Sequence, residues 1–156
     1  MKKALIISLM FVVVFSAVGC VSGGTTNVSS KLYKGDGYSI SVPEKGYHYE
    51  KDYDDGAIED KWESITRDDI NIEVITYKHT DKELAQKMFL MEHDDYIFED
   101  LMGYSICGME PDGDTLWFNL HEANGNTYIV SWEYPKNASE STRTELSEIA
   151  KTFKTE

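Results

Sequence analysis

The sequence predicts an α+β protein in which helices cover an antiparallel β-sheet. Three observations lead to this prediction. Two runs of alternating residues flank Asn124-Gly125, a dipeptide that favours a two-residue hairpin turn. Other strand-like runs come before this hairpin, and most are joined by short polar turns. Apolar residues recur at helical spacing once in the middle of the chain and once at its end.

Residues 1–19 are expected to be a lipoprotein signal peptide. Lys2 and Lys3 precede the apolar run Ala4–Phe15, which is shorter than the roughly 20 residues that a membrane-spanning helix needs. The segment Ala17-Val18-Gly19-Cys20 resembles the bacterial lipobox, with alanine where leucine is usual. An ordinary signal peptide followed by an incidental cysteine is the alternative.

Lipid on Cys20 would hold the mature chain on the extracytoplasmic face of the cell membrane. Each buried CH₂ contributes about 0.8 kcal/mol, so two or three acyl chains anchor stably where one does not. Residues 20–31 comprise this cysteine and a polar, glycine-containing tether, whose average reach is about 15 to 20 Å. Residues 32–156 are expected to form a single domain.

The charge of the mature chain restricts its partners. Without Lys2 and Lys3, 13 basic residues stand against 28 acidic ones, a net charge of −15. This charge excludes nucleic acid as an expected partner and opposes docking of the domain on anionic lipid. Cys107 would then be the second and last cysteine, so no internal disulfide forms, and a buried inert thiol is expected there rather than a reactive one.

Four segments before residue 80 have strand-like patterns. The first, Gly37–Pro43, alternates and stops at a proline. The acidic, tyrosine-rich segment 46–56 is expected to be a loop or an edge strand. Ile58–Thr66 and Ile70–Tyr77 are expected to form a hairpin that turns at Arg67-Asp68-Asp69. The residues expected on buried faces are Tyr38, Ile40 and Val42 in the first strand and Ile70, Ile72 and Val74 in the last.

Two helices are predicted from capping-box spacings. Thr80 and Glu83 have this spacing before a helix over about 81–92, and Asn137 and Glu140 have it before a final helix. The apolar residues at helical spacing are Leu84, Ala85, Met88, Phe89 and Met91 in the first helix and Leu146, Ile149, Ala150 and Phe153 in the second.

The hairpin over Thr115–Tyr134 is the clearest structural signal in the chain. A strand over Gly103–Met109 and a turn at Pro111–Asp114 come before it. The turn at Asn124-Gly125 pairs Trp117 with Trp132, His121 with Tyr128 and Thr115 with Tyr134. The opposite face then carries Leu116, Phe118, Leu120 and Ile129. Because both faces bear large apolar groups, both are expected to be covered.

The domain resembles the Mog1/PsbP-like fold family, which includes many small bacterial lipoproteins. The carrying features are the opening Tyr38–Glu44, similar to the family's "gysi-x-vP" start, and the ending Glu148–Lys154. Gly46-Tyr47 stands where the family usually has Gly-Trp. The resemblance implies a sheet packed between helices, an α/β/α sandwich, and a binding or accessory role without a shared active site. A cystatin-like α+β roll is the alternative fold.

No residue pattern predicts catalysis. Gly103-Tyr104-Ser105-Ile106-Cys107 has cysteine where a nucleophile elbow needs its last glycine, and no helix pattern follows it. A pair of Cys107 and His121 would act only if the fold brought the two side chains together. We therefore expect a protein that is not an enzyme and has no cofactor.

Acidic clusters raise the alternative of a calcium-dependent surface module. They are Asp52-Asp54-Asp55, Asp94-Asp95 beside His93, Glu99-Asp100, and Asp112 with Asp114. Calcium prefers several oxygen ligands, but neither glycine-containing loop fits an EF-hand, and a solvated acidic surface explains the clusters equally well. No metal site is predicted.

The aromatic face of the final hairpin raises a second alternative, a glycan or small-molecule binder. Its candidate ligand-binding residues are Trp117, Trp132, Tyr128 and Tyr134. Flat rings on one face could stack on sugar rings, or a helix could cover them as core. The leading expectation is a membrane-anchored lipoprotein without catalytic activity, which binds an envelope protein or glycan.

Overall fold

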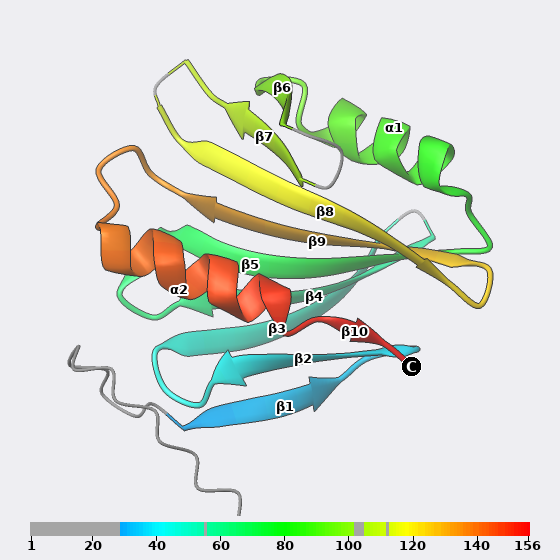
Figure 1. The fold of residues 1–156 in the computed structure, drawn as a ribbon, viewed down its shortest axis with the longest axis horizontal. Helices are drawn as coiled ribbons and strands as arrows, with labels where there is room; N and C mark the ends of the chain where they lie inside the picture. Colours follow the sequence, from blue (N-terminus) through cyan, green and yellow to red (C-terminus); the bar gives the residue numbers. More distant parts are fainter. Residues whose placement is uncertain (1–28, 55, 102–104, 112) are drawn as a thin grey trace, which may run out of the picture.

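The computed structural model describes residues 29–54, 56–101, 105–111 and 113–156 (Figure 1). The strands are β1 (Ser30–Lys34), β2 (Tyr38–Pro43), β3 (Tyr47–Asp54), β4 (Ala57–Ser64), β5 (Arg67–Lys78), β6 (Ile97–Leu101), β7 (Ser105–Met109), β8 (Thr115–Ala123), β9 (Asn126–Tyr134) and β10 (Lys154–Thr155). The helices are α1 (Lys82–Glu92) and α2 (Glu140–Lys151). None of the helices described is long and apolar enough to cross a membrane. The predicted signal peptide and Cys20 lie outside the described residues.

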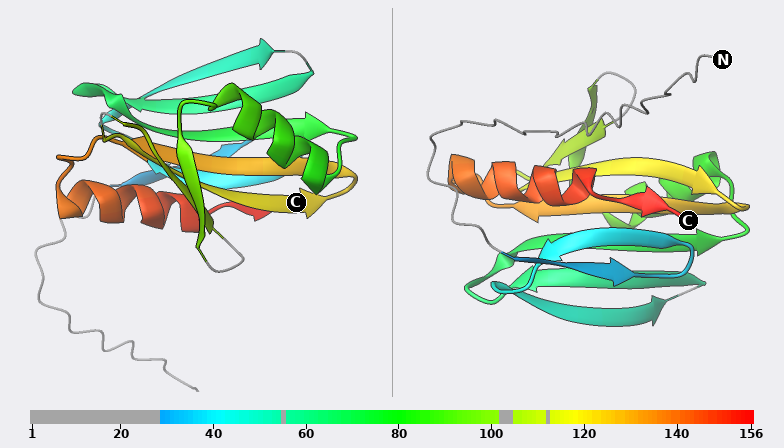
Figure 2. Two further views of the ribbon diagram at one scale, coloured as in Figure 1. Left: turned by 90° about the horizontal axis from the view of Figure 1, so that it is seen from above. Right: turned by 60° about the horizontal axis from the view of Figure 1, so that its bottom comes forward.

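The strands form two antiparallel sheets. Seven strands make the larger sheet in the order β3-β4-β5-β9-β8-β7-β6, and β1, β2 and β10 make the smaller one in the order β1-β2-β10. The α+β class predicted from the sequence is therefore confirmed. Two further views show the small sheet beside α2 (Figure 2). In the same views, α1 lies on the other side of the large sheet.

The β8–β9 hairpin has the predicted register. Trp117 faces Trp132, and the other two predicted pairs form as well. The turn residues Asn124 and Gly125 have φ values of 54° and 76°, the left-handed backbone that a two-residue turn of this type requires. The dipeptide therefore sets which side chains of β8 and β9 share a face.

The β4–β5 hairpin turns earlier than predicted. Ser64 pairs with Arg67, so the turn lies at Ile65 and Thr66, and Arg67 and Asp69 belong to β5. The prediction at residues 67–69 was wrong because the Arg67 guanidinium bonds the Asp69 carboxylate, two residues further along the same strand. A polar run that suggested a turn is thus the charged start of a strand. The segment 46–56, expected as a loop or an edge strand, contains the edge strand β3.

Three strands were not predicted. β1 includes residues 30 and 31, which were assigned to the tether, and β6 follows α1 in a segment left without an element. The two-residue β10 comes after α2, which ends at Lys151, before Phe153 of its predicted stripe. Most side chains of β1 are exposed, and Tyr33 alone is partly buried. All three strands lie at sheet edges. A strand with little burial shows little alternation, so sequence patterning does not reveal it.

The helix N-caps also differ from those predicted. Asp81 caps α1, its carboxylate accepting from the Leu84 N–H at 2.9 Å, and Ser139 caps α2, its hydroxyl accepting from the Thr142 N–H at 3.1 Å. Thr80 instead donates to the Lys78 carbonyl. Each capping residue follows the predicted one by one or two positions. The helices themselves begin within a few residues of their predicted starts.

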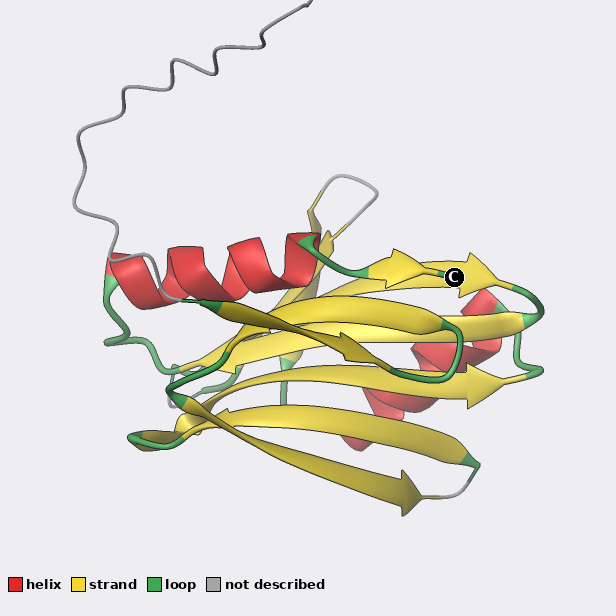
Figure 3. Ribbon diagram, turned by 90° about the horizontal axis from the view of Figure 1, so that it is seen from below, coloured by secondary structure: helices red, strands yellow, loops and turns green. Residues whose placement is uncertain are grey.

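The large sheet has a separate apolar core on each face. On one face α1 packs on β5, β8 and β9 through Ala85 and Phe89, whereas Leu84 and Met91, also expected on its apolar stripe, are exposed. On the other face α2 and β2 pack together on the sheet. The α2-side core includes the predicted stripe residues Leu146, Ile149, Ala150 and Phe153 and the predicted strand residues Tyr38, Ile40, Val42, Ile70, Ile72 and Val74. Seen from below, α1 lies partly hidden behind the strands (Figure 3).

Candidate functional site

The four aromatic residues singled out in the sequence lie on one face of β8 and β9, and α2, β2 and Phe153 cover most of it. Tyr128 is fully buried, and Trp132 and Tyr134 are 6% and 8% exposed. They share a core with Leu146 and Ile149 of α2. Trp117 is only partly buried and lies at the margin of this core. The face therefore presents one indole at its margin rather than four open rings.

Trp117 is held in a defined orientation. Its ring is nearly parallel to that of Trp132, with an interplanar angle of 5° and 6.2 Å between centroids. Its indole N–H donates to the Tyr134 hydroxyl at 2.9 Å. Cross-strand pairing and this hydrogen bond together limit the ring's rotation.

A pocket of about 310 Å³ opens beside this indole, between α2 and β8; we call it the α2–β8 pocket. Its lining residues are Trp117, Asn119, Trp132, Tyr134, Arg143, Ser147 and Lys151. The three helix residues follow one another at intervals of four, which places them on one side of α2. The volume is at the lower end of the range for small-molecule sites.

Arg143 is fixed at one end of the pocket. Its Nε donates to the Ala138 carbonyl at 3.1 Å and its Nη2 to the Lys136 carbonyl at 2.7 Å. The guanidinium carbon lies 5.5 Å from the centroid of the Tyr134 ring, a cation–π contact. At the other end, the Lys151 ammonium lies 2.6 Å from the Glu148 carboxylate in a largely exposed pair.

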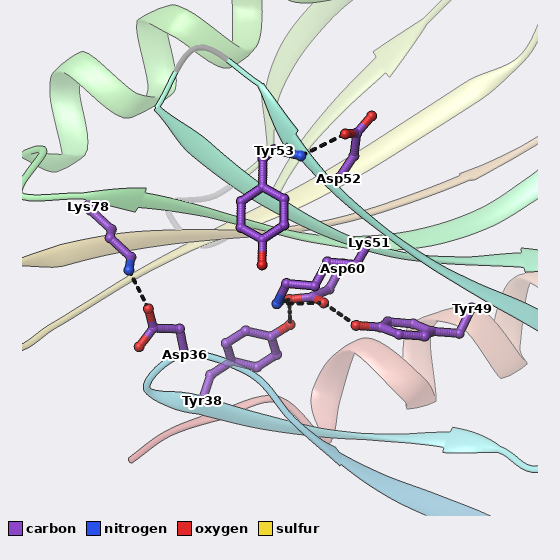
Figure 4. Close-up of polar contacts among 8 residues, drawn as sticks. All are labelled: Asp36, Tyr38, Tyr49, Lys51, Asp52, Tyr53, Asp60 and Lys78. Atoms are coloured by element: carbon purple, nitrogen blue, oxygen red, sulfur yellow. Dashed lines mark hydrogen bonds and ion pairs between the residues drawn. The ribbon is translucent and has the colours of Figure 1, made fainter.

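A second aromatic and polar cluster, the Asp60 cluster, lies between the two sheets. The Asp60 carboxylate is 3% exposed and accepts from Tyr38 at 2.6 Å and from Tyr49 at 2.5 Å, while the Lys51 ammonium lies 3.3 Å away (Figure 4). Burial and these hydrogen bonds raise the pKa of Tyr38 and of Tyr49 above that of a free tyrosine. Both hydroxyls therefore stay protonated as donors. The cluster links β2, β3 and β4, and its polar groups bond one another.

Glu73 on β5 is a largely buried carboxylate. Burial raises its pKa to about 7, an effect that Lys61 opposes and that Glu59, Glu133 and Glu92 reinforce. The Lys61 ammonium is 3.9 Å away. These groups lie on the α1 side of the sheet, on the face opposite the α2–β8 pocket.

A larger hollow of about 560 Å³ lies at the first turn of α2. Its lining includes two cations, Lys45 and Arg67, and Arg67 is engaged by the Asp69 carboxylate and the Asn137 side-chain oxygen. The helix N-terminus is likewise occupied by its cap, Ser139. Two of the groups that could attract a ligand into this hollow, Arg67 and the helix N-terminus, are therefore already engaged.

The described acidic clusters do not converge. Within the described ranges, no group of three or more histidine, cysteine, aspartate or glutamate side chains is placed to hold a metal ion. His93 stacks on Phe89 and contacts its carbonyl through Nδ1 at 2.8 Å. Asp55 and Asp112 lie outside the described residues, as do the side chains of Asp54 and Asp100.

Cys107 and His121 are separated along the sheet. Cys107 pairs with Trp117, and four residues of strand, about 13 Å, lie between Trp117 and His121. His121 contacts the Phe153 ring, with 4.7 Å between centroids. Burial raises the pKa of the Cys107 thiol, which disfavours the reactive thiolate. Ser105 begins a strand, and residues 102–104 lie outside the described part of the chain.

Comparison with solved structures gives the fold. The solution structure of cyanobacterial PsbP (CyanoP) from Synechocystis sp. PCC 6803 is similar over 89% of this chain and 99% of that one, with a TM-score of 0.56 and 13% sequence identity. A crystal structure from Bacteroides thetaiotaomicron VPI-5482 matches 77% of this chain and 45% of that one, with a TM-score of 0.43 and 16% identity. No protein-family model and no curated protein matches the sequence. The chain thus has a PsbP-like fold.

Proposed function

We propose that this protein is a membrane-anchored extracytoplasmic lipoprotein that binds an envelope component and has no catalytic activity. The observation that carries the proposal is the placement of Cys20. It ends a signal-like segment and precedes β1, the first strand, by ten residues. A stretch of this length and polar composition suits a tether rather than part of the fold.

Two features of the domain support a binding role. The titratable groups of the Asp60 cluster are engaged with one another rather than directed at a cavity. The α2–β8 pocket, in contrast, combines a fixed indole with two cations. A small-molecule or glycan binder is therefore the second candidate function. We further propose that the domain is a Mog1/PsbP-like α/β/α sandwich, because α1 and α2 pack on opposite faces of the large sheet.

Labelling with radioactive palmitate in a bacterial host tests the anchor. The mature wild-type chain should be labelled and sediment with membranes, and Cys20→Ala should abolish both properties. Cys107→Ala is the matched control, because it removes the other cysteine and should leave labelling intact. Unlabelled mature protein, or label that survives Cys20→Ala, would refute the anchor.

A further inference from the structure

We propose that the α2–β8 pocket binds a sugar ring that carries an anionic group. This inference deepens the proposed binding role and rests on it. Three features of the pocket carry it. They are an oriented indole in its lining, two cations on α2, and a lining without carboxylates.

The indole provides a surface for a sugar ring. Trp117 is partly buried, and its stacking on Trp132 and its bond to Tyr134 already fix its orientation. A ring that is fixed before binding loses little conformational freedom when a ligand arrives. The electron-rich face of an aromatic ring attracts the positively polarised C–H groups of a sugar. Asn119, also in the lining, adds an amide on the same strand.

The two cations determine the charge and the size of the ligand. Arg143 is held by two backbone carbonyls, and a guanidinium offers five donors in a fixed plane that suits carboxylate or phosphate oxygens. Lys151 lies eight residues further along α2, which corresponds to about 12 Å. This span and the volume of about 310 Å³ suit one or two sugar rings.

The lining differs in charge from the rest of the chain. The mature sequence is strongly acidic, yet the seven lining residues include Arg143 and Lys151 and no aspartate or glutamate. Glu148 pairs with Lys151 from outside the lining, but both side chains are more than 60% exposed, and such pairs are weak in water. An anionic ligand can therefore displace Glu148 at small cost.

Calorimetric titration of the full chain, purified from membranes in a detergent without a sugar headgroup, tests the proposal. The probes are glucuronic acid, galacturonic acid, glucose 6-phosphate and neutral glucose, which separate carboxylate from phosphate and both from an uncharged ring. At least one anionic sugar should bind more tightly than glucose. Lys151→Gln should weaken that binding roughly tenfold, and Trp117→Ala should weaken it to a similar degree.

Lys87→Gln is the matched control, because it removes a charge from the exposed side of α1, on the other face of the sheet. It should bind as the wild type does. The proposal is overturned if none of the three anionic sugars binds, if glucose binds equally well, or if Lys151→Gln is indistinguishable from Lys87→Gln. Palmitate labelling of the same preparations shows whether a negative result contradicts only the pocket proposal or also the lipoprotein assignment.

Discussion

The Asp60 cluster and the α2–β8 pocket contain the same kinds of residue and differ in how those residues are used. Both combine tyrosine with lysine. In the Asp60 cluster, two hydroxyls and an ammonium converge on one buried carboxylate. In the pocket, the cations have backbone or exposed partners, and a hollow remains beside the indole. The presence of a buried counter-charge therefore separates the Asp60 cluster from the proposed binding site.

The largest effect is expected from Asp60→Ala. Removing this carboxylate leaves the buried Tyr38 hydroxyl without its acceptor and Lys51 without its counter-charge. The free energy of unfolding, measured by urea denaturation, should fall by about 3 kcal/mol. Asp52→Ala removes an exposed carboxylate from the neighbouring strand and should change it by no more than about 0.5 kcal/mol. Equal losses from the two variants would show that the cluster contributes little.

Glu73→Gln should stabilise the protein at high pH, because this carboxylate lacks the donors that Asp60 has. Its pKa is raised from 4.5 to about 7 in the folded state, so the folded state keeps a proton that the unfolded state releases. Stability is therefore lost as the pH rises from about 4.5 to 7. At pH 8, the free energy of unfolding should be about 1 to 3 kcal/mol higher for Glu73→Gln than for the wild type.

The gain in the free energy of unfolding from Glu73→Gln should shrink by more than half at pH 5, where the wild-type side chain is still protonated in the folded state. The same substitution at the exposed Glu148 serves as the control, and it should give no comparable gain at pH 8. An advantage of Glu73→Gln that is the same at both pH values would contradict the assigned titration.

Arg143→Gln should have a smaller effect on stability. The variant loses two hydrogen bonds to backbone carbonyls before α2 and a contact with the Tyr134 ring. Thermal unfolding should show a loss of about 1 kcal/mol. A loss as large as that of Asp60→Ala would mean that Arg143 contributes mainly to the stability of the fold.

Lys151→Gln should have the smallest effect on folding. Its ammonium makes an exposed pair with Glu148, so the free energy of unfolding should stay within about 0.5 kcal/mol of the wild type. The same variant is expected to lose affinity for an anionic sugar. A large loss of stability would show that Lys151 is a structural residue. It would also remove the contrast between the Asp60 cluster and the α2–β8 pocket.

The sequence predicts the parts of the fold in which a local signal and burial agree. Asn124-Gly125 sets the register of β8 and β9, and the alternation in β2 matches its buried face. β1, β6 and β10 were missed because edge strands need not alternate. The turn after β4 was misplaced because the charges of Arg67 and Asp69 suit a turn as well as an exposed strand.

The candidate sites were predicted less completely than the fold. Trp117 and Trp132 were identified from the register, but their burial depends on where α2 docks. Asp60 was missed, although it stands between Ile58 and Trp62 in an alternating run, a signal for an inward-facing carboxylate. Arg143, Ser147 and Lys151 are visible as a polar stripe of α2. No local pattern indicates that this stripe faces Trp117.

The position of β1 has a mechanical consequence. If the chain is anchored at Cys20, any force between membrane and domain enters at Ser30 and passes first through the five antiparallel residue pairs that join β1 to β2. The ring of Tyr33 in β1 also contacts Trp62, with 5.2 Å between centroids. Peeling of β1 would therefore lengthen the tether and uncover aromatic surface beside the Asp60 cluster.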